Sequence, residues 1–249
     1  MASANLDPLC PEDLPSEAAL AATIDHAILK PEFTRDDVDQ QLDIAAEWKV
    51  FSVCVRPSDI AYAVRRLDGS GVAVGTVIGF PHGTTSTATK VAETAQALAD
   101  GASEVDMVVN IGWLRSGFDA DVEADIAAVV AAAEGQISKV ILETSLLDDE
   151  QIARGSRLTD AAGADFVKTS TGFAGGGATA PHVRLMRENV SDRVRVKASG
   201  GVHSLADALA MIDAGATRLG TSGSATILGE LRAILAGGTA SNAVDHSSY

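Results

Sequence analysis

Ala162-Gly-Ala-Asp-Phe-Val-Lys168 is the stretch that decides the fold, because its layout occurs three times in the chain. Asp100-Gly-Ala-Ser-Glu-Val-Asp106 and Ala214-Gly-Ala-Thr-Arg-Leu-Gly220 repeat it. Each copy has a glycine of the kind that ends helices, then a small residue, then the start of a short strand. The repeat therefore predicts a recurring unit in which a helix stops and a strand follows at once.

Eight short strand-like runs alternate with longer segments that have helical spacing. Val38, Leu42 and Ala45, for example, follow the three-and-four spacing of one helix face. Alternating strands and helices imply right-handed crossovers and a parallel sheet. Eight such units in 249 residues predict a single-domain α/β fold, a (β/α)8 TIM barrel, rather than an open doubly wound sheet. The predicted strands are 23–29, 50–55, 72–78, 105–109, 139–143, 166–169, 195–198 and 218–221.

The two ends of the chain differ from this regular pattern. Residues 1–17 contain prolines and acidic residues without an apolar period, and residues 237–249 are rich in Gly, Ser and Asn. We therefore expect an N-terminal leader over 1–17, the barrel over 18–236 and a flexible tail over 237–249.

The composition limits the classes of partner and cofactor. The formal net charge is −15, and an acidic surface repels phosphate backbones, so we expect no nucleic-acid partner. The N-terminus lacks a signal-peptide layout, and no apolar run approaches the about 18 residues of a membrane span. We expect no membrane partner and a cytoplasmic location. Cys10 and Cys54 form no metal motif, and the five histidines lack ligand spacing, so no metal and no cofactor is expected.

Three charged residues are predicted to point into the barrel: Asp106, Lys168 and Lys197. Asp106 and Lys168 lie five residues after the glycine of their repeats, which places both side chains at one height on the inner face. Charges inside a barrel are costly unless they are paired. A purely structural salt bridge would leave the second lysine without a partner. A second ammonium group would instead keep its neighbour neutral and nucleophilic, as Schiff-base chemistry needs.

Several strands closely resemble those of the deoxyribose-phosphate aldolases, which are class I aldolases. The similarity runs in order from about Ile24 to about Leu228 and has compatible spacing. The segments that resemble the family are Ile24-Asp-His-Ala-Ile-Leu-Lys-Pro31, Gly75-Thr-Val-Ile-Gly-Phe-Pro81, Glu104-Val-Asp-Met-Val-Val-Asn110, Phe166-Val-Lys-Thr-Ser-Thr-Gly172 and Val196-Lys-Ala-Ser-Gly-Gly201.

This resemblance implies a reversible aldol cleavage of 2-deoxy-D-ribose 5-phosphate to D-glyceraldehyde 3-phosphate and acetaldehyde. By position, Lys168 forms the imine, Lys197 keeps Lys168 partly neutral, and Asp106 works with Lys197 or water in proton transfer. We expect Asp106 to pair with Lys197 rather than with Lys168. Asp25 is predicted to point inward, either as a contact for a substrate hydroxyl or as a partner of Lys197.

Three glycine-rich turns at the ends of the late strands are candidates for binding the substrate phosphate. Each turn taken alone is typical of an ordinary loop, so the prediction depends on their convergence. Many family members carry Thr where this chain has Ala27, some carry Lys where it has Phe173, and others carry Ser where it has Gly223. The predicted phosphate contacts are Thr171, Gly172, Gly200, Gly201, Ser222 and Gly223.

The C-terminal Tyr249 lies on the expected tail, where solvation is the default interpretation. Some family members also end in Tyr, and there the residue is thought to assist proton transfer in the site. For assembly we consider a homodimer. Three other functions stay open: an aldolase for a different sugar phosphate, an isomerase that uses the lysines for proton transfer alone, and a sensor that binds a phosphosugar. The first would differ in substrate profile, and the second would form no covalent adduct.

Overall fold

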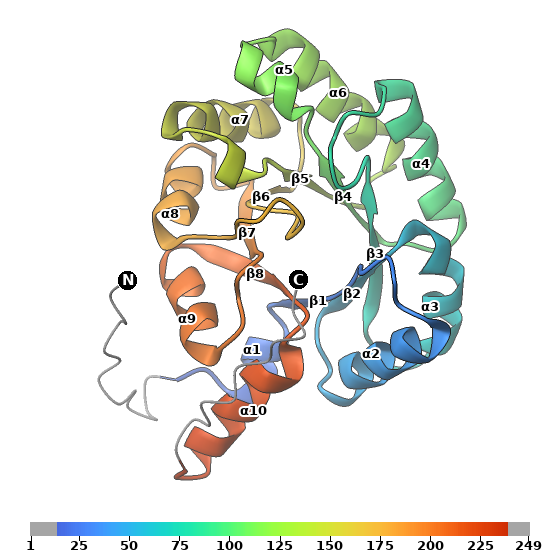
Figure 1. Ribbon diagram of the computed structural model, residues 1–249, viewed down its shortest axis with the longest axis vertical. Helices are drawn as coiled ribbons and strands as arrows, with labels where there is room; N and C mark the ends of the chain where they lie inside the picture. Colours follow the sequence, from blue (N-terminus) through green and yellow to red (C-terminus); the bar gives the residue numbers. More distant parts are fainter. Residues whose placement is uncertain (1–13, 239–249) are drawn as a thin grey trace.

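Eight parallel strands close into a barrel, and helices surround it (Figure 1). The structure is a computed structural model, and it describes residues 14–238. The strands follow one another around the barrel in chain order, and β8 pairs with β1 to close the sheet. The predicted (β/α)8 TIM barrel is therefore confirmed.

All eight predicted strands are present, and their ends differ from the prediction by no more than two residues. They are three to six residues long. The strands are β1 (Ile24–Ile28), β2 (Ser52–Val55), β3 (Ala73–Ile78), β4 (Glu104–Val108), β5 (Ile137–Ile141), β6 (Phe166–Lys168), β7 (Arg195–Ser199) and β8 (Ala216–Thr221).

Polar side chains fix where several helices begin. Thr34, Asp148 and Ser204 each accept a hydrogen bond from the first turn of a helix and form a capping box with the residue three positions later. The α-helices of the described chain are α1 (Glu17–Ala21), α2 (Arg35–Glu47), α3 (Ile60–Arg66), α4 (Thr87–Ala99), α5 (Ile111–Ser116), α6 (Asp119–Ala132), α7 (Asp149–Ala161), α8 (Ala180–Glu188), α9 (Leu205–Asp213) and α10 (Ser224–Leu235). Short 3₁₀ turns are η2 (Pro57–Asp59) and η3 (Thr144–Leu146).

The repeated glycines end helices α4, α7 and α9, as the sequence predicts. Gly101, Gly163 and Gly215 have φ of +100°, +89° and +108°, which is the region that favours glycine. Each glycine lies two residues after its helix ends, and a strand begins within three residues. The same stop signal therefore aligns the starts of β4, β6 and β8 around the barrel.

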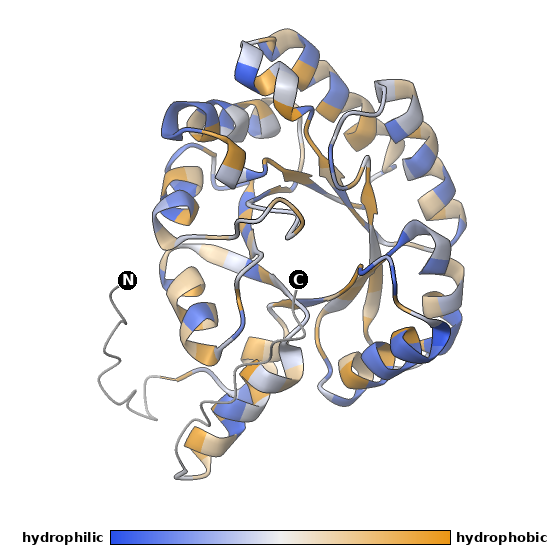
Figure 2. Cartoon of the chain, viewed as in Figure 1, coloured by the Kyte–Doolittle hydropathy of each residue, from blue (hydrophilic) through white to orange (hydrophobic). Residues whose placement is uncertain are grey.

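Apolar side chains fill the layer between the strands and the helices. In Figure 2, which is coloured by hydropathy, both the strands and the helices carry hydrophobic residues. Val105, Met107 and Val167 are at most 1% exposed and belong to this core, so they point away from the barrel interior as predicted. Strand side chains alternate, and their neighbours Asp106 and Lys168 therefore point inward.

The first helix, α1, begins at Glu17, and Leu14 packs against the core. Residues 1–13 and 239–249, which include most of the expected leader, most of the expected tail and Tyr249, lie outside the described residues. Between residues 14 and 238, no helix is both long and apolar enough to cross a membrane.

Candidate active site

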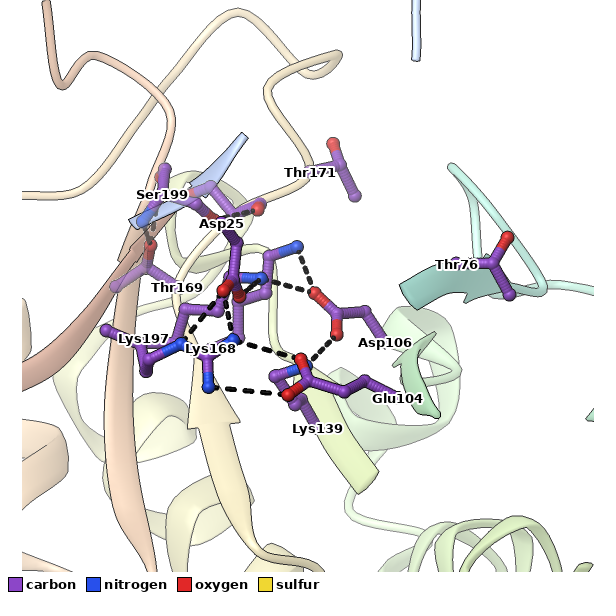
Figure 3. Close-up of polar contacts among 12 residues, drawn as sticks. Asp25, Thr76, Glu104, Asp106, Lys139, Lys168, Thr169, Thr171, Lys197 and Ser199 are labelled. Atoms are coloured by element: carbon purple, nitrogen blue, oxygen red, sulfur yellow. Dashed lines mark hydrogen bonds and ion pairs between the residues drawn. The ribbon is translucent and has the colours of Figure 1, made fainter. Parts of the chain in front are cut away.

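The barrel interior holds seven charged side chains. Figure 3 labels all of them except Arg218. Each of the seven is at most 5% exposed, and together they come from six of the eight strands. Two are on β4, where residues two positions apart share a face. The seven are Asp25 on β1, Glu104 and Asp106 on β4, Lys139 on β5, Lys168 on β6, Lys197 on β7 and Arg218 on β8.

Asp106 lies at the centre of three lysines. Its Oδ2 atom accepts hydrogen bonds from Lys168 Nζ at 2.7 Å and from Lys197 Nζ at 2.8 Å. Its Oδ1 atom accepts one from Lys139 Nζ at 2.8 Å. The expectation that Asp106 pairs with Lys197 rather than with Lys168 is therefore wrong. Lys168 and Lys197 are register partners on adjacent strands, so a single carboxylate oxygen reaches both amines.

Asp25 is a partner of Lys197, which was one of its two expected roles. Asp25 Oδ2 lies 2.5 Å from Lys197 Nζ, and Oδ1 accepts hydrogen bonds from Ser52 Oγ at 2.7 Å and Arg218 Nε at 2.8 Å. Burial opposes the charge of Asp25, but the nearby cations, Lys197 first, lower the pKa of this carboxyl to about 2. The side chain is therefore ionised throughout the physiological range.

The electrostatics of the two central lysines differ. Burial lowers the pKa of Lys168, and the ammonium group of Lys197 lowers it further, while Asp106 opposes both. Burial also acts against the charge of Lys197, yet the carboxylates of Asp106 and Asp25 outweigh it and raise that pKa. The pKa of Asp106 is held well below its usual value, because three ammonium groups together exceed the effect of burial. This arrangement favours a neutral amine on Lys168 beside a charged Lys197.

Gly220 on β8 has no side chain, and this leaves room for the side chain of Lys197. Gly220 is the counterpart of Asp106 and Lys168 in the repeat. A Cβ atom at Gly220 would lie 2.7 Å from Ser199 Cβ and 3.2 Å from Lys197 Cε. Any side chain at this position would therefore displace β7 side chains.

Some of the predicted phosphate-binding residues meet in one hollow, and others do not. Gly200, Gly201 and Ser222 line it together with four neighbours: Val202, His203, Gly220 and Thr221. Ser222 Oγ is buried there without a hydrogen-bond partner among the described residues. Gly200 and Gly201 have positive φ, which opens the turn after β7.

The remaining three predicted contacts lie outside the lining of that hollow. Gly223 is the N-cap of α10, and its N–H already donates to Thr221 Oγ1 at 2.9 Å. Thr171 directs both its hydroxyl and its N–H to the carboxylate of Glu143, and Gly172 follows it with a φ of +87°. Figure 3 shows Thr171 apart from the charged cluster.

A small apolar cluster faces the barrel interior beside these charges. Ala27 and Cys54 are 5% exposed and pack with Leu29 and Val77. Ala27, where family members commonly carry Thr, therefore contributes to an apolar wall. Phe173, where some family members carry Lys, packs edge-to-face with Phe80 at a centroid distance of 5.3 Å. Burial raises the pKa of the Cys54 thiol to about 11, so this side chain is a neutral member of the wall.

Sequence reasoning missed Glu104, Lys139, Arg218 and Glu143. Strand alternation could have found the first and third, because Glu104 and Arg218 lie two residues before the inward positions 106 and 220. Lys139 has no such marker, since its strand lacks the repeat. Glu143 follows β5 with a φ of +59°, and only the turn in space brings it to Thr171.

No group of His, Cys, Asp and Glu side chains in residues 14–238 could hold a metal ion. Among the described residues, the charged groups of the barrel interior are three amines, one guanidinium and three carboxylates. Buried lysines that share a carboxylate inside a closed (β/α)8 barrel are typical of enzymes that use an amine for covalent or acid–base chemistry.

Comparison with known proteins narrows this class to one family. The sequence profile of the DeoC/LacD family aldolases matches residues 19–234, and the chain belongs to this family. A deoxyribose-phosphate aldolase of Staphylococcus haemolyticus is 57% identical over 208 residues, covering 84% of this chain and 94% of that protein. Deoxyribose-phosphate aldolase 2 of Staphylococcus aureus is 56% identical over 213 residues, covering 86% and 97%.

A solved structure agrees with the fold and the family. The deoxyribose phosphate aldolase from Aeropyrum pernix, described as a tetramer, superposes with a TM-score of 0.82. It is 31% identical, and the match covers 90% of this chain and 95% of that one.

Proposed function

We propose that this protein is a class I aldolase that reversibly cleaves 2-deoxy-D-ribose 5-phosphate into D-glyceraldehyde 3-phosphate and acetaldehyde, in deoxyribose phosphate catabolism. The observation that carries the proposal is the contrast between Lys168, whose pKa is lowered, and Lys197, whose pKa is raised, on one carboxylate oxygen. The names of the relatives at 56–57% identity support the substrate.

The reaction begins with attack of the neutral Lys168 amine on the aldehyde carbon, C1, of the open-chain sugar. The carbinolamine loses its hydroxyl as water, and a protonated imine forms. The C3 hydroxyl then gives up its proton, the C2–C3 bond breaks, and its electron pair moves into the imine to give an enamine. Glyceraldehyde 3-phosphate leaves. Protonation of C2 and hydrolysis of the imine release acetaldehyde and restore Lys168.

Asp106 and Lys197 act as the proton carriers in this scheme. Asp106 Oδ2 is within hydrogen-bond distance of both amines, so protons can pass between Lys168 and Lys197 through one oxygen atom. Lys197 stays charged and favours the neutral form of Lys168. Asp25 neutralises part of the Lys197 charge and holds its side chain in place.

The hollow lined by Gly200, Gly201 and Ser222 is our candidate for the phosphate site. The unpartnered Ser222 Oγ offers a donor, and the start of α10 adds a favourable dipole for an anion. Gly223 orients this helix start. Thr171 and Gly172 shape the opposite loop, which Glu143 holds in place. Such local donors would offset the repulsion that a net charge of −15 imposes on a phosphorylated sugar.

The catalytic proposal is tested by reductive trapping. Borohydride reduction in the presence of acetaldehyde should add one ethyl group to the peptide that contains Lys168, as measured by mass spectrometry. The Lys168→Met variant is the control and should take up none at that peptide. An active enzyme without an adduct would favour the isomerase alternative, and an adduct on another lysine would reassign the nucleophile. Activity should also survive prolonged chelation.

The phosphate proposal is tested by a substitution at position 222. Ser222→Asp should lower kcat/KM for deoxyribose 5-phosphate by at least about tenfold, because a second negative charge would repel the anion. Activity on free deoxyribose should fall much less. Ser222→Ala is the matched control and removes only the hydroxyl. Equal losses on both substrates would show that the turn serves the barrel rather than the phosphate.

For the remaining features we predict a barrel unit over 18–236, a cytoplasmic location and a homodimer, which sedimentation would test. Tyr249 as a proton-transfer residue is a further prediction. Removal of the last residue should lower the rate of C2 proton exchange in acetaldehyde without affecting imine trapping.

A further inference from the structure

Six of the seven buried charges form a closed ring of alternating sign. Within the ring, each cation contacts two carboxylates and each carboxylate contacts two cations. In order around the ring the members are Lys139, Asp106, Lys197, Asp25, Arg218 and Glu104, which returns to Lys139.

The contacts of the ring are all short. Starting from Lys139–Asp106, the N···O separations around the ring are 2.8, 2.8, 2.5, 2.8, 3.0 and 2.6 Å. The ring contains three cations and three carboxylates, so its net charge is zero when all members are ionised. Its members are at most 5% exposed, and buried charges at such distances interact strongly.

Lys168 is the seventh charge and stands outside the ring. Among the described residues its only ion pair is with Asp106, whose two oxygens already receive Lys139 and Lys197. A charged Lys168 therefore gives these seven groups a net charge of +1, and a neutral Lys168 gives them zero. Each other interior cation pairs with two carboxylates. Lys168 pairs with one, Asp106, which also pairs with two other lysines.

We propose that the neutral ring makes Lys168 the surplus cation of the barrel, so that Lys139, Glu104 and Arg218 direct proton loss to Lys168 without contacting it. These three are positioning residues that act through Asp106, Asp25 and Lys197. The inference rests on the proposed role of Lys168 as the imine-forming residue. It extends the control of that amine from one neighbouring lysine to the charge balance of the whole barrel interior.

Two other titratable groups face Lys168, and neither belongs to the ring. The thiol of Cys54 on β2 has a pKa raised to about 11 by burial and is neutral. Glu143, just after β5, has a pKa raised by burial and accepts hydrogen bonds from Thr171. Because Glu143 is present in the wild type and in every ring variant, its charge cancels when their midpoints are compared. The remaining groups that face Lys168 are Asp106 and Lys197, which are already in the ring.

A pair of substitutions with opposite signs tests the ring. Glu104→Gln keeps the shape of the side chain and leaves the ring with a charge of +1, so the Lys168 pKa should fall. Lys139→Met leaves the ring at −1, so the pKa should rise. Neither residue contacts Lys168, and we expect each midpoint to move by on the order of one pH unit. The double variant is neutral again and should return towards wild type.

The measurement is the rate of acetaldehyde trapping at the Lys168 peptide from pH 6 to 11, with each variant normalised to its own plateau. Lys90→Met is the matched control, because Lys90 is also fully buried and pairs with Asp125 at 2.6 Å, but outside the barrel interior. It should leave the midpoint unchanged. If Glu104 and Lys139 had only a structural role, their variants would show lower plateau rates of trapping, and the two pH midpoints would not move in opposite directions.

The outcomes separate the two proposals. No adduct at Lys168 in the wild type would overturn the proposed function. An adduct with midpoints that coincide, or that move in the same direction for Glu104→Gln and Lys139→Met, would overturn the ring. If Lys139→Met does not fold, Glu104→Gln decides alone: a midpoint that stays or moves to alkaline pH refutes the inference, and an acid shift supports it.

Discussion

Lysines are buried in two regions of this molecule, and the regions treat them differently. In the layer between strands and helices, Lys90 of α4 is 0% exposed and donates to Asp125 of α6 at 2.6 Å and to the carbonyl oxygen of Val108 at 2.9 Å. There one ammonium group meets one carboxylate. In the barrel interior, four cations share three carboxylates.

Under the proposed function, burial alone does not make a lysine reactive. Both environments exclude water and oppose the charge of the amine. Lys90 and Asp125, the outer pair, balance each other's charge, whereas the seven interior groups include four cations and three carboxylates. The surplus, rather than the depth, distinguishes Lys168 from Lys90.

The largest expected effect separates the two lysines by activity. Lys168→Met removes the proposed nucleophile and should reduce kcat by roughly four orders of magnitude or more, because the proposed mechanism assigns imine formation to this amine alone. Lys90→Met should keep kcat within a few-fold of wild type for the fraction that is folded. Steady-state assays with active-site titration check both. A comparable loss of kcat in the two variants would remove the distinction.

The second prediction concerns the stability of the outer pair. Lys90→Met leaves the Asp125 carboxylate buried without its cation and should cost about 3–5 kcal/mol in the free energy of unfolding. Replacing both partners, by Lys90→Met with Asp125→Leu, should recover most of that loss, because an apolar pair needs no desolvation of charge. Urea unfolding measures both variants. A double variant as unstable as the single one would show that packing, not the stranded charge, sets the cost.

The third prediction uses another buried base of the outer layer. Burial lowers the pKa of His26 to about 4, although its hydrogen bond to Gln41 opposes this, and the unfolded chain titrates near 6.5. Between pH 6.5 and about 4 the unfolded state binds a proton that the folded state does not, so the free energy of unfolding decreases as the pH is lowered. The expected loss between pH 7.5 and pH 5 is about 2 kcal/mol. Urea midpoints of wild type and His26→Gln at both values test this: the variant should lose less.

The smallest expected effect is a shift within the interior. Lys197→Leu removes the ammonium group next to Lys168 and should move the pH midpoint of imine trapping by about one unit to alkaline pH. Lys197→Arg keeps the charge and is the matched control. A common midpoint for wild type and Lys197→Leu would limit Lys197 to proton transfer or substrate contact.

The sequence predicted the barrel well because its signals are local. A glycine that ends a helix, followed by a strand, can be read within seven residues, and alternation then places Asp106 and Lys168 inward. The partners of those charges depend on which strands adjoin and at what register. Asp106 meets Lys139 because β4 and β5 pair these two residues directly. Lys168 and Lys197 are register partners on β6 and β7, so one oxygen of Asp106 reaches both amines. No local pattern carries that information, so the expected preference of Asp106 for Lys197 was wrong.

The loops were harder to predict for the same reason. Gly200, Gly201 and Ser222 meet because β7 and β8 adjoin, which the barrel order implies. Thr171 instead turns to Glu143, which has a left-handed backbone that few glutamates adopt. A residue that departs from its usual conformation leaves no trace in a pattern of residue types.

The absence of a side chain at Gly220 sets the position of the Lys197 amine by steric contact, separately from the charges of the interior. A methyl group there would press on Ser199 and on Cε of Lys197, the carbon that carries the amine. Gly220→Ala would therefore shift the Lys197 ammonium group by a fraction of an ångström while keeping its charge. In directed evolution of this enzyme, substitution of Gly220 would therefore adjust the geometry of proton transfer while the charges stay the same.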